Sequence, residues 1–218
     1  MMSENSAFTL LAATILPIYF NYIAGKQGLS DVQYLAYWGY AVSVATLLTA
    51  LAGPVFGTVA DTKGYKKPVF TIALGIGTIA SVALGFAKYW LAFLVVFVIA
   101  KVGYSVTLVF YDSMLVDVTS EDRMDEVSSQ GYAWGYIGSC VPFVICLLVV
   151  LNAGKIGITM ETAMMVSFVI ITVWWVIMTL PLLKTYHQKY YVEKKLACFF
   201  RKASKESALH CKNVKKEK

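Results

Sequence analysis

The stretch GPVFGTVADTKGYKKP, residues 53–68, decides how this chain is built. It begins inside an uncharged run that reaches back to residue 32, and it ends where a second uncharged run starts. Its charges are confined to a short loop, in which Gly64 permits a tight turn. Both runs are long enough to cross a bilayer, which takes roughly 20 apolar residues. The stretch therefore predicts two membrane-spanning helices joined by a polar hairpin.

The composition extends this interpretation to the whole chain. Of its 218 residues, 58% are hydrophobic and 15% are charged. A soluble domain usually carries about 25% charged residues. Such high hydrophobicity excludes an intrinsically disordered chain and argues against an ordinary globular enzyme.

Uncharged windows mark five spans directly, and a sixth is interrupted by Lys101 alone. The predicted spans cover residues 5–25, 32–60, 68–87, 89–111, 127–154 and 162–183. Each is long enough to cross a bilayer. We therefore expect an all-α membrane protein with a six-helix transmembrane domain over residues 1–183 and a basic cytoplasmic tail over residues 184–218.

The positive charges indicate an orientation. With a cytoplasmic N-terminus, the inner segments hold three Lys or Arg in 60–67, one in 118–126 and eleven from Lys184 onward. The outer loops hold Lys26, Lys88 and Lys155. Because cytoplasmic loops are enriched in Lys and Arg, both termini are predicted to be cytoplasmic, in the plasma or inner membrane of the cell. A basic tail beside a span suits anionic lipid, so the expected partner is the bilayer and not nucleic acid.

The hairpin residues have physical roles of their own. Gly57 would let two helices approach closely, and Asp61 lies where a helix leaves the membrane. Lys66 and Lys67 would anchor the loop at the inner headgroups. On these grounds alone, a generic cytoplasmic hairpin with lysines that reach the interface is the alternative.

The spacing of the hairpin residues also resembles a family signature. The loop reads G-x-x-x-D-x-x-G-x-K-K, which is similar to the loop 2–3 signature of the major facilitator superfamily, G-x-x-x-D-[RK]-x-G-[RK]-[RK]. Thr62 departs from it, because Arg or Lys is usual there. The resemblance implies that the aspartate supports contacts between two transporter halves. The signature residues are Gly57, Asp61, Gly64, Lys66 and Lys67.

Further stretches resemble the vacuolar-effluxer-like branch of that superfamily, whose members include autophagy-related amino-acid effluxers. They are Asn5-Ser-Ala-Phe8 with Pro17-Ile-Tyr-Phe20, Leu108-Val-Phe-Tyr111-Asp112 with Leu115-Val-Asp117, and Gly131-Tyr-Ala-Trp134-Gly135-Tyr-Ile-Gly138. The resemblance covers roughly residues 5–195. Superfamily members have two six-helix halves with the substrate path between them. The resemblance therefore implies an N-terminal half that is cropped at its start, with an unmatched tail beyond residue 195.

Lys101 is the charge most relevant to function. It lies midway along the fourth span, where a lysine costs roughly 2.5–3.5 kcal/mol on insertion scales. Such residues usually face a cavity and pair with an anion, which predicts a contact with a substrate carboxylate or a role in proton coupling. The alternative is that the amine reaches the interface, either beside a short loop or because the span starts later.

Three residues toward the inner end of the fourth span complete the candidate translocation path: Tyr111, Asp112 and Asp117. The two aspartates are five residues apart and point about 140° away from each other around a helix. One could therefore face the pore while the other pairs with a Lys or Arg of an inner loop. Ordinary interfacial charge is the alternative.

The fifth span carries a stripe of glycines, Gly131, Gly135 and Gly138. Small residues permit close helix packing, either static or as part of a rocking movement. The sequence contains no H-E-x-x-H, G-x-S-x-G or P-loop motif, and its two histidines lie in the tail. We therefore expect no enzyme activity, no metal site and no cofactor.

These observations predict gradient-driven transport of a small solute. The branch resemblance suggests efflux of amino acids or other metabolites. The principal alternative is a truncated, non-transporting fragment or a membrane interaction module. The expected protein partner is a second six-helix half or a second copy of the chain, whichever of these functions the chain has.

Overall fold

The computed structural model describes residues 3–191 and is built from helices throughout that part of the chain. The long helices are α1 (Ser3–Lys26), α2 (Asp31–Asp61), α3 (Lys66–Ala83), α4 (Trp90–Val118), α5 (Met124–Leu151) and α7 (Met160–Thr185). The connections contain the short helices η1 (Leu84–Phe86), η2 (Glu121–Arg123) and α6 (Ala153–Ile156). Most of the predicted basic tail, residues 192–218, lies outside the described residues.

Within residues 3–191, six helices are long and apolar enough to cross a membrane, which confirms the predicted fold class. The largest difference from the predicted spans concerns the fourth, which was expected to end at residue 111. Helix α4 continues to Val118 and carries Asp112 and Asp117 inside it. Charge was a poor guide to the end of this helix, because the Asp117 carboxylate is neutralised within the bundle by Lys66.

Local sequence signals explain where several helices begin. A capping box starts α2: the Ser30 side chain accepts a hydrogen bond from the Gln33 N–H, and the Gln33 side chain accepts one from the Ser30 N–H. The Thr159 hydroxyl caps α7 through the Thr162 N–H. Gly64 adopts a φ of 78° between α2 and α3, a left-handed conformation that favours glycine.

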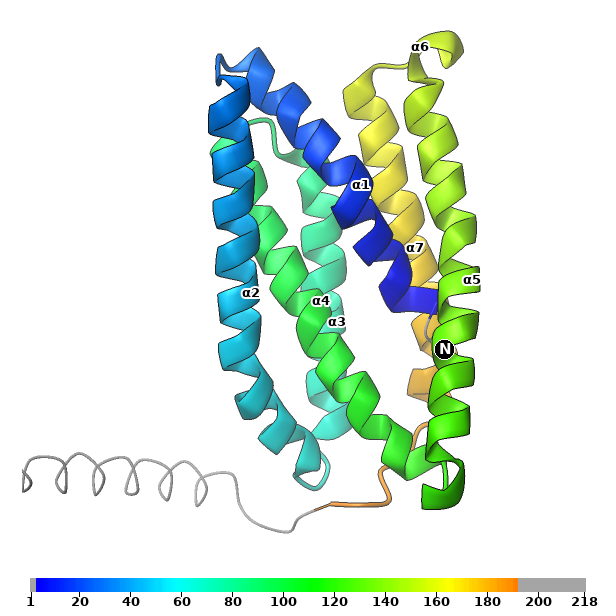
Figure 1. The fold of residues 1–218 in the computed structure, drawn as a ribbon. Coiled ribbons are helices and arrows are strands. Elements are labelled where there is room, and N and C mark those ends of the chain that lie inside the picture. The colour runs from blue at the N-terminus through cyan, green and yellow to red at the C-terminus, as the bar shows by residue number, and fades with distance from the viewer. Residues whose placement is uncertain (1–2, 192–218) are drawn as a thin grey trace, which may run out of the picture.

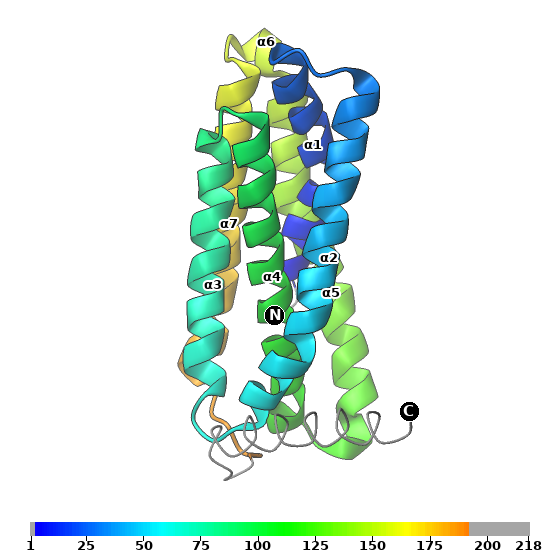
Figure 2. The same ribbon diagram turned by 90° about the vertical axis from the view of Figure 1, so that its left-hand side faces the viewer.

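The helices form an elongated bundle with two layers (Figures 1 and 2). Helices α1, α2, α4 and α5 lie toward the viewer in Figure 1, and α3 and α7 lie behind them. The most extensive pairings join α3 with α4, α2 with α4, and α1 with α5, while α7 packs against α5, α1 and α3. The α2–α3 loop, the α4–α5 connection and the chain after α7 meet at the same end, which we call the inner end.

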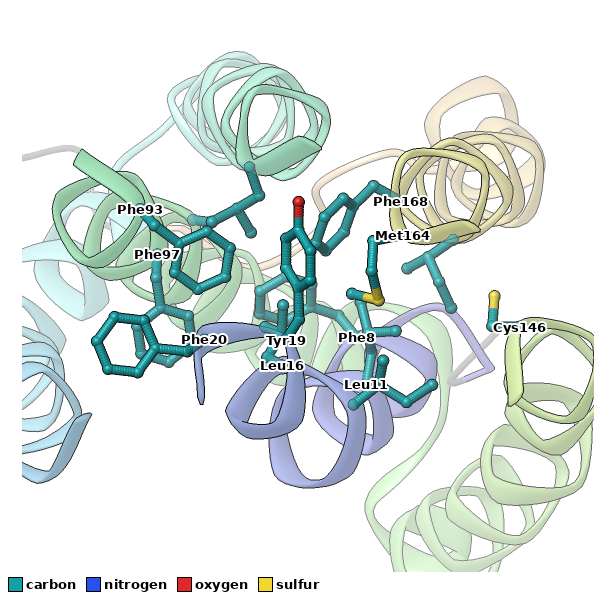
Figure 3. Packing of buried hydrophobic residues seen from close by; sticks show 14 of the residues in the cluster. Phe8, Leu11, Leu16, Tyr19, Phe20, Phe93, Phe97, Cys146, Met164 and Phe168 are labelled. Atoms are coloured by element: carbon teal, nitrogen blue, oxygen red, sulfur yellow. The ribbon is translucent and has the colours of Figure 1, made fainter. Parts of the chain in front are cut away.

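Aromatic side chains fill the core between α1, α4 and α7 (Figure 3). Phe20 of α1 stacks on Phe93 of α4, with ring centroids 5.9 Å apart. Tyr19 meets the edges of Phe93 and Phe168. These rings fix α1 between the other two helices, and they thereby fix the position of the first turns of α1 relative to α4.

Helices α2 and α5 are the least buried spans. Only 11% of the α2 window and 22% of the α5 window are buried, against 39–50% for the other four spans. In a membrane, lipid can cover such exposed faces. Both helices lie in the layer that also contains α1 and α4. Within residues 3–191, α2 and α5 are therefore the spans least covered by other helices.

Candidate functional site: a lysine pocket and an inner ion-pair cluster

A pocket of about 290 Å³ lies between α1, α2 and α4. Helix α1 contributes one wall, Trp38 and Val42 of α2 contribute another, and α4 contributes Phe97 and Lys101. Trp38 and Phe97 face each other with ring centroids 4.6 Å apart. The full lining is Thr9, Ala12, Ala13, Pro17, Trp38, Val42, Phe97 and Lys101.

Lys101 is the charged member of this pocket. Its side chain is half-buried near the middle of α4, and its Nζ lies 5.2 Å from the centroid of the Tyr104 ring. A cation over an aromatic face gains about 0.5–2 kcal/mol, which offsets part of the cost of placing it there. Within residues 3–191, the ammonium forms no ion pair. Lys101 therefore lies at a cavity, and the described part of the chain supplies no counter-charge for it.

Tyr104 lies next to two residues of the pocket lining, Lys101 and Thr9. Tyr104 is buried, and its hydroxyl is hydrogen-bonded to the Thr9 hydroxyl at 2.6 Å. Its ring also packs against Phe8 and Trp175. Tyr104 therefore ties α1 and α7 to α4 directly beside the lysine, which holds the pocket walls in register.

At the inner end, Lys66 and Asp117 form a buried ion pair. The Lys66 Nζ lies 2.9 Å from Asp117 Oδ2 and also donates to the Ser113 carbonyl at 3.0 Å. Lys66 is 3% exposed and Asp117 is 2% exposed. Because neither charge reaches water, each depends on the other for neutralisation.

The segment that follows α7, residues 186–191, crosses beneath this ion pair, and we call it the strap (Figure 1). The Tyr186 hydroxyl donates a hydrogen bond to Asp117 Oδ2. The backbone N–H groups of Lys189 and Tyr190 donate to Asp117 Oδ1 at 3.0 and 2.8 Å. Burial and the neighbouring carboxylate raise the pKa of the Tyr186 phenol above its ordinary value, so the phenol stays protonated and keeps donating.

Gln188 connects the strap to the α2–α3 loop. Its Oε1 accepts a hydrogen bond from the Gly64 N–H at 3.0 Å. Its Nε2 donates to the carbonyls of Ala60 and Thr62 at 3.3 and 3.4 Å. A single amide side chain thereby satisfies three backbone groups at the end of α2 and in the loop, while Asp117 satisfies the strap backbone from the other side.

Three of the predicted site residues have contacts that bear on the roles expected for them. Lys66 does not reach the headgroups, because it turns inward to Asp117, whereas Lys67 is exposed. Asp117 pairs with a lysine of the inner loop, which is one of the two arrangements expected for the aspartates, and its carboxylate also accepts hydrogen bonds from the strap. Gly57 does not permit a close approach of helices within the described chain, since a Cβ at this position would meet no atom within 4 Å.

Asp112 and Tyr111 lie one to two turns above the ion pair, beside a smaller pocket of about 130 Å³ between α4, α5 and α7. Asp112 is exposed and forms no ion pair with any residue of the described part. Gly131 lines the same pocket from α5. The structure therefore separates the candidate path residues into a lysine pocket and an aspartate pocket, which it does not bring together.

The glycines of α5 lie on the inward side of that helix. Gly135 is buried, and Gly131 and Gly138 are half-buried. A close approach of two helices occurs between α3 and α4, where a Cβ on Gly103 of α4 would stand 3.1 Å from the Gly77 Cα of α3. Sequence reasoning missed this crossing, because two isolated glycines in apolar runs carry no spacing signal.

A charged side chain in a mid-span pocket of a helical bundle is typical of membrane transport proteins. Comparison with known proteins specifies the class: residues 5–205 match the Major Facilitator Superfamily. The chain belongs to this superfamily and is a multi-pass membrane protein. The match runs past residue 195, where the sequence resemblance was expected to end.

One relative gives a measure of length. The chain is 38% identical over 195 residues to the uncharacterized MFS-type transporter YxiO of Bacillus subtilis (strain 168). That alignment covers 87% of this chain and 46% of the relative. The chain thus spans about half the length of the curated relative that it matches.

Proposed function

We propose that this chain forms the N-terminal half of a secondary transporter, in which the Lys101 pocket contacts a small solute. The observation that carries the proposal is an ammonium group in a cavity near the middle of a span, without an ion-pair partner among residues 3–191. Secondary transporters place their substrate site near the bilayer midplane, at the interface of two halves. The driving force would be an ion or solute gradient, and Asp112 and Tyr111 would line the inner part of the path.

The proposed orientation and location follow from the distribution of charge. The inner end carries the α2–α3 loop with its exposed Lys63 and Lys67, together with Arg123 of the α4–α5 connection. Positive loops favour the cytoplasmic side, so both termini are assigned to the cytoplasm of a cell. Resemblance to the vacuolar-effluxer-like branch supports efflux of an amino acid or another metabolite.

The surface of α2 supports pairing with a second six-helix half. Gly57 and Asp61 are four residues apart, so they share one helix face, and that face is open at Gly57. The Asp61 carboxylate is exposed, with no hydrogen bond to any residue in 3–191. These two signature residues are therefore available to a partner helix, in line with the role that the family resemblance implies.

The rival proposal is an interaction module or non-transporting fragment that uses the same surface. The exposed faces of α2 and α5 favour it as much as they favour a transporter half. Crosslinking through a cysteine at Gly57 distinguishes the two. A transporter half crosslinks to a co-expressed second half, whereas a self-pairing module crosslinks to another copy of this chain.

Transport itself is tested by counterflow in liposomes that contain the chain together with its second half. We expect a solute that accumulates in protein-containing liposomes, and loss of that accumulation in Lys101→Gln. Lys155→Gln is the matched control, because Lys155 is exposed in α6 at the outer end. Absence of counterflow for every solute in a broad panel would contradict the transporter proposal.

A further inference from the structure

The charge balance of the Lys101 pocket restricts what it can bind. Lys101 is charged, and none of the other seven lining residues is acidic. The hydroxyl group in the lining, that of Thr9, is already hydrogen-bonded to Tyr104 at 2.6 Å. An anionic group beside the ammonium would be neutralised, whereas a cationic group would be brought next to a like charge.

Asp112 does not supply a second anchor within the same binding site. Lys101 and Asp112 are eleven residues apart on α4, which places them on one helix face but roughly 16 Å apart along the axis. The ammonium and carboxylate of an amino acid are attached to the same carbon atom. One small amino acid therefore cannot pair with both side chains, and its ammonium would lose water without gaining a counter-charge.

The remaining walls favour an apolar body. Trp38, Phe97 and Val42 form one side, and Ala12 and Pro17 of α1 form the other. A volume of about 290 Å³ is at the small end of ligand pockets. The lining thus combines a single cation with apolar surfaces that suit a few carbon atoms.

We infer that this pocket selects small monocarboxylates with an apolar body over zwitterionic amino acids of the same skeleton. The inference rests on the proposed transport function and makes its substrate class specific. It departs from the amino-acid substrates that the branch resemblance suggests, because the described pocket lacks an acidic side chain for the ammonium. The carboxylate pairs with Lys101, and the body packs against Trp38 and Phe97.

A matched ligand series tests the inference on the chain itself. The probes are 4-methylpentanoate, leucine, which is the same skeleton with an α-ammonium, and 3-methylbutylamine, which lacks the carboxylate. Equilibrium dialysis of each labelled compound against the purified 218-residue chain in nanodiscs gives the binding constants. We expect 4-methylpentanoate to bind at least about tenfold more tightly than leucine, and the amine to bind most weakly.

Variants assign the preference to the lysine. Lys101→Gln should weaken binding of 4-methylpentanoate by about tenfold or more, Lys101→Arg should retain it, and Lys155→Gln should leave it unchanged. Leucine binding that equals or exceeds that of 4-methylpentanoate overturns the inference, as does carboxylate binding unaffected by Lys101→Gln. Absence of binding for all three probes overturns it as well.

The transport proposal and the carboxylate inference can be contradicted independently of each other. A complete transporter that exchanges leucine better than 4-methylpentanoate overturns the carboxylate inference and leaves the transport proposal standing. Carboxylate binding that depends on Lys101, in a protein that shows no counterflow of any solute, overturns the transport proposal and supports the binding site.

Discussion

Removing the negative charge of Asp117 should strongly destabilise the inner end of the bundle. Asp117→Asn preserves the shape of the side chain but leaves the Lys66 ammonium, which is 3% exposed, without a counter-charge. Loss of one partner of a buried ion pair costs about 3–5 kcal/mol. For a domain of this size, that corresponds to a fall in melting temperature of roughly 6–20 °C.

The assay is thermal unfolding of the purified chain in detergent, followed by the loss of monodisperse protein on size-exclusion chromatography. Asp112→Asn is the control, because Asp112 is exposed and forms no ion pair with described residues. The double variant Lys66→Met/Asp117→Asn should recover most of the loss, since it removes both buried charges and keeps a side-chain oxygen for the strap N–H groups. A melting temperature for Asp117→Asn that matches wild type, or a double variant as unstable as the single one, would refute the assigned pairing.

Three further outcomes follow from the same contacts. Gly103→Val should destabilise the chain by about 1–3 kcal/mol through overpacking, whereas Gly39→Ala, with open space around its Cβ, should not; urea unfolding distinguishes them. Because burial raises the pKa of Tyr186, the protonated phenol stabilises the folded state fully below pH 10. This contribution to stability is lost progressively as the pH rises above 10. The melting temperature should therefore fall more steeply above pH 10 for wild type than for Tyr186→Phe. Gln188→Ala should speed limited proteolysis of the α2–α3 loop severalfold, and an unchanged cleavage rate would contradict the strap contacts.

The helices were predictable because a membrane span has a strong sequence signal. Uncharged windows located five of the six spans, the sixth was apolar apart from Lys101, and Ser30 with Gln33 carries a recognisable helix start. The end of α4 was not predictable in this way. A hydropathy window treats Asp117 as a boundary, whereas its burial depends on Lys66, which is 51 residues away in the chain.

Of the pocket residues, only Lys101 was predictable from the sequence, because it is a charged residue within an apolar run. Lys101 was identified because a charge inside an apolar run has a cost that requires an explanation. Trp38 and Phe97 were not, since aromatic residues are common in spans, and only packing of α2 against α4 brings their rings within 4.6 Å. Gln188 lay in a segment that charge alone described as tail, and its three loop contacts depend on how the chain leaves α7.

The strap also determines where the rest of the polypeptide is attached. Its backbone, as far as Tyr190, is hydrogen-bonded to Asp117 of α4. Its Gln188 side chain is hydrogen-bonded to the end of α2 and to the α2–α3 loop. A linker that continues from residue 191 is therefore tethered beneath α2, α3 and α4, and not at the last turn of α7. A pulling force on that linker would act first in shear on the Asp117 contacts, so the bundle would be loaded through α4 before α7 bears any tension.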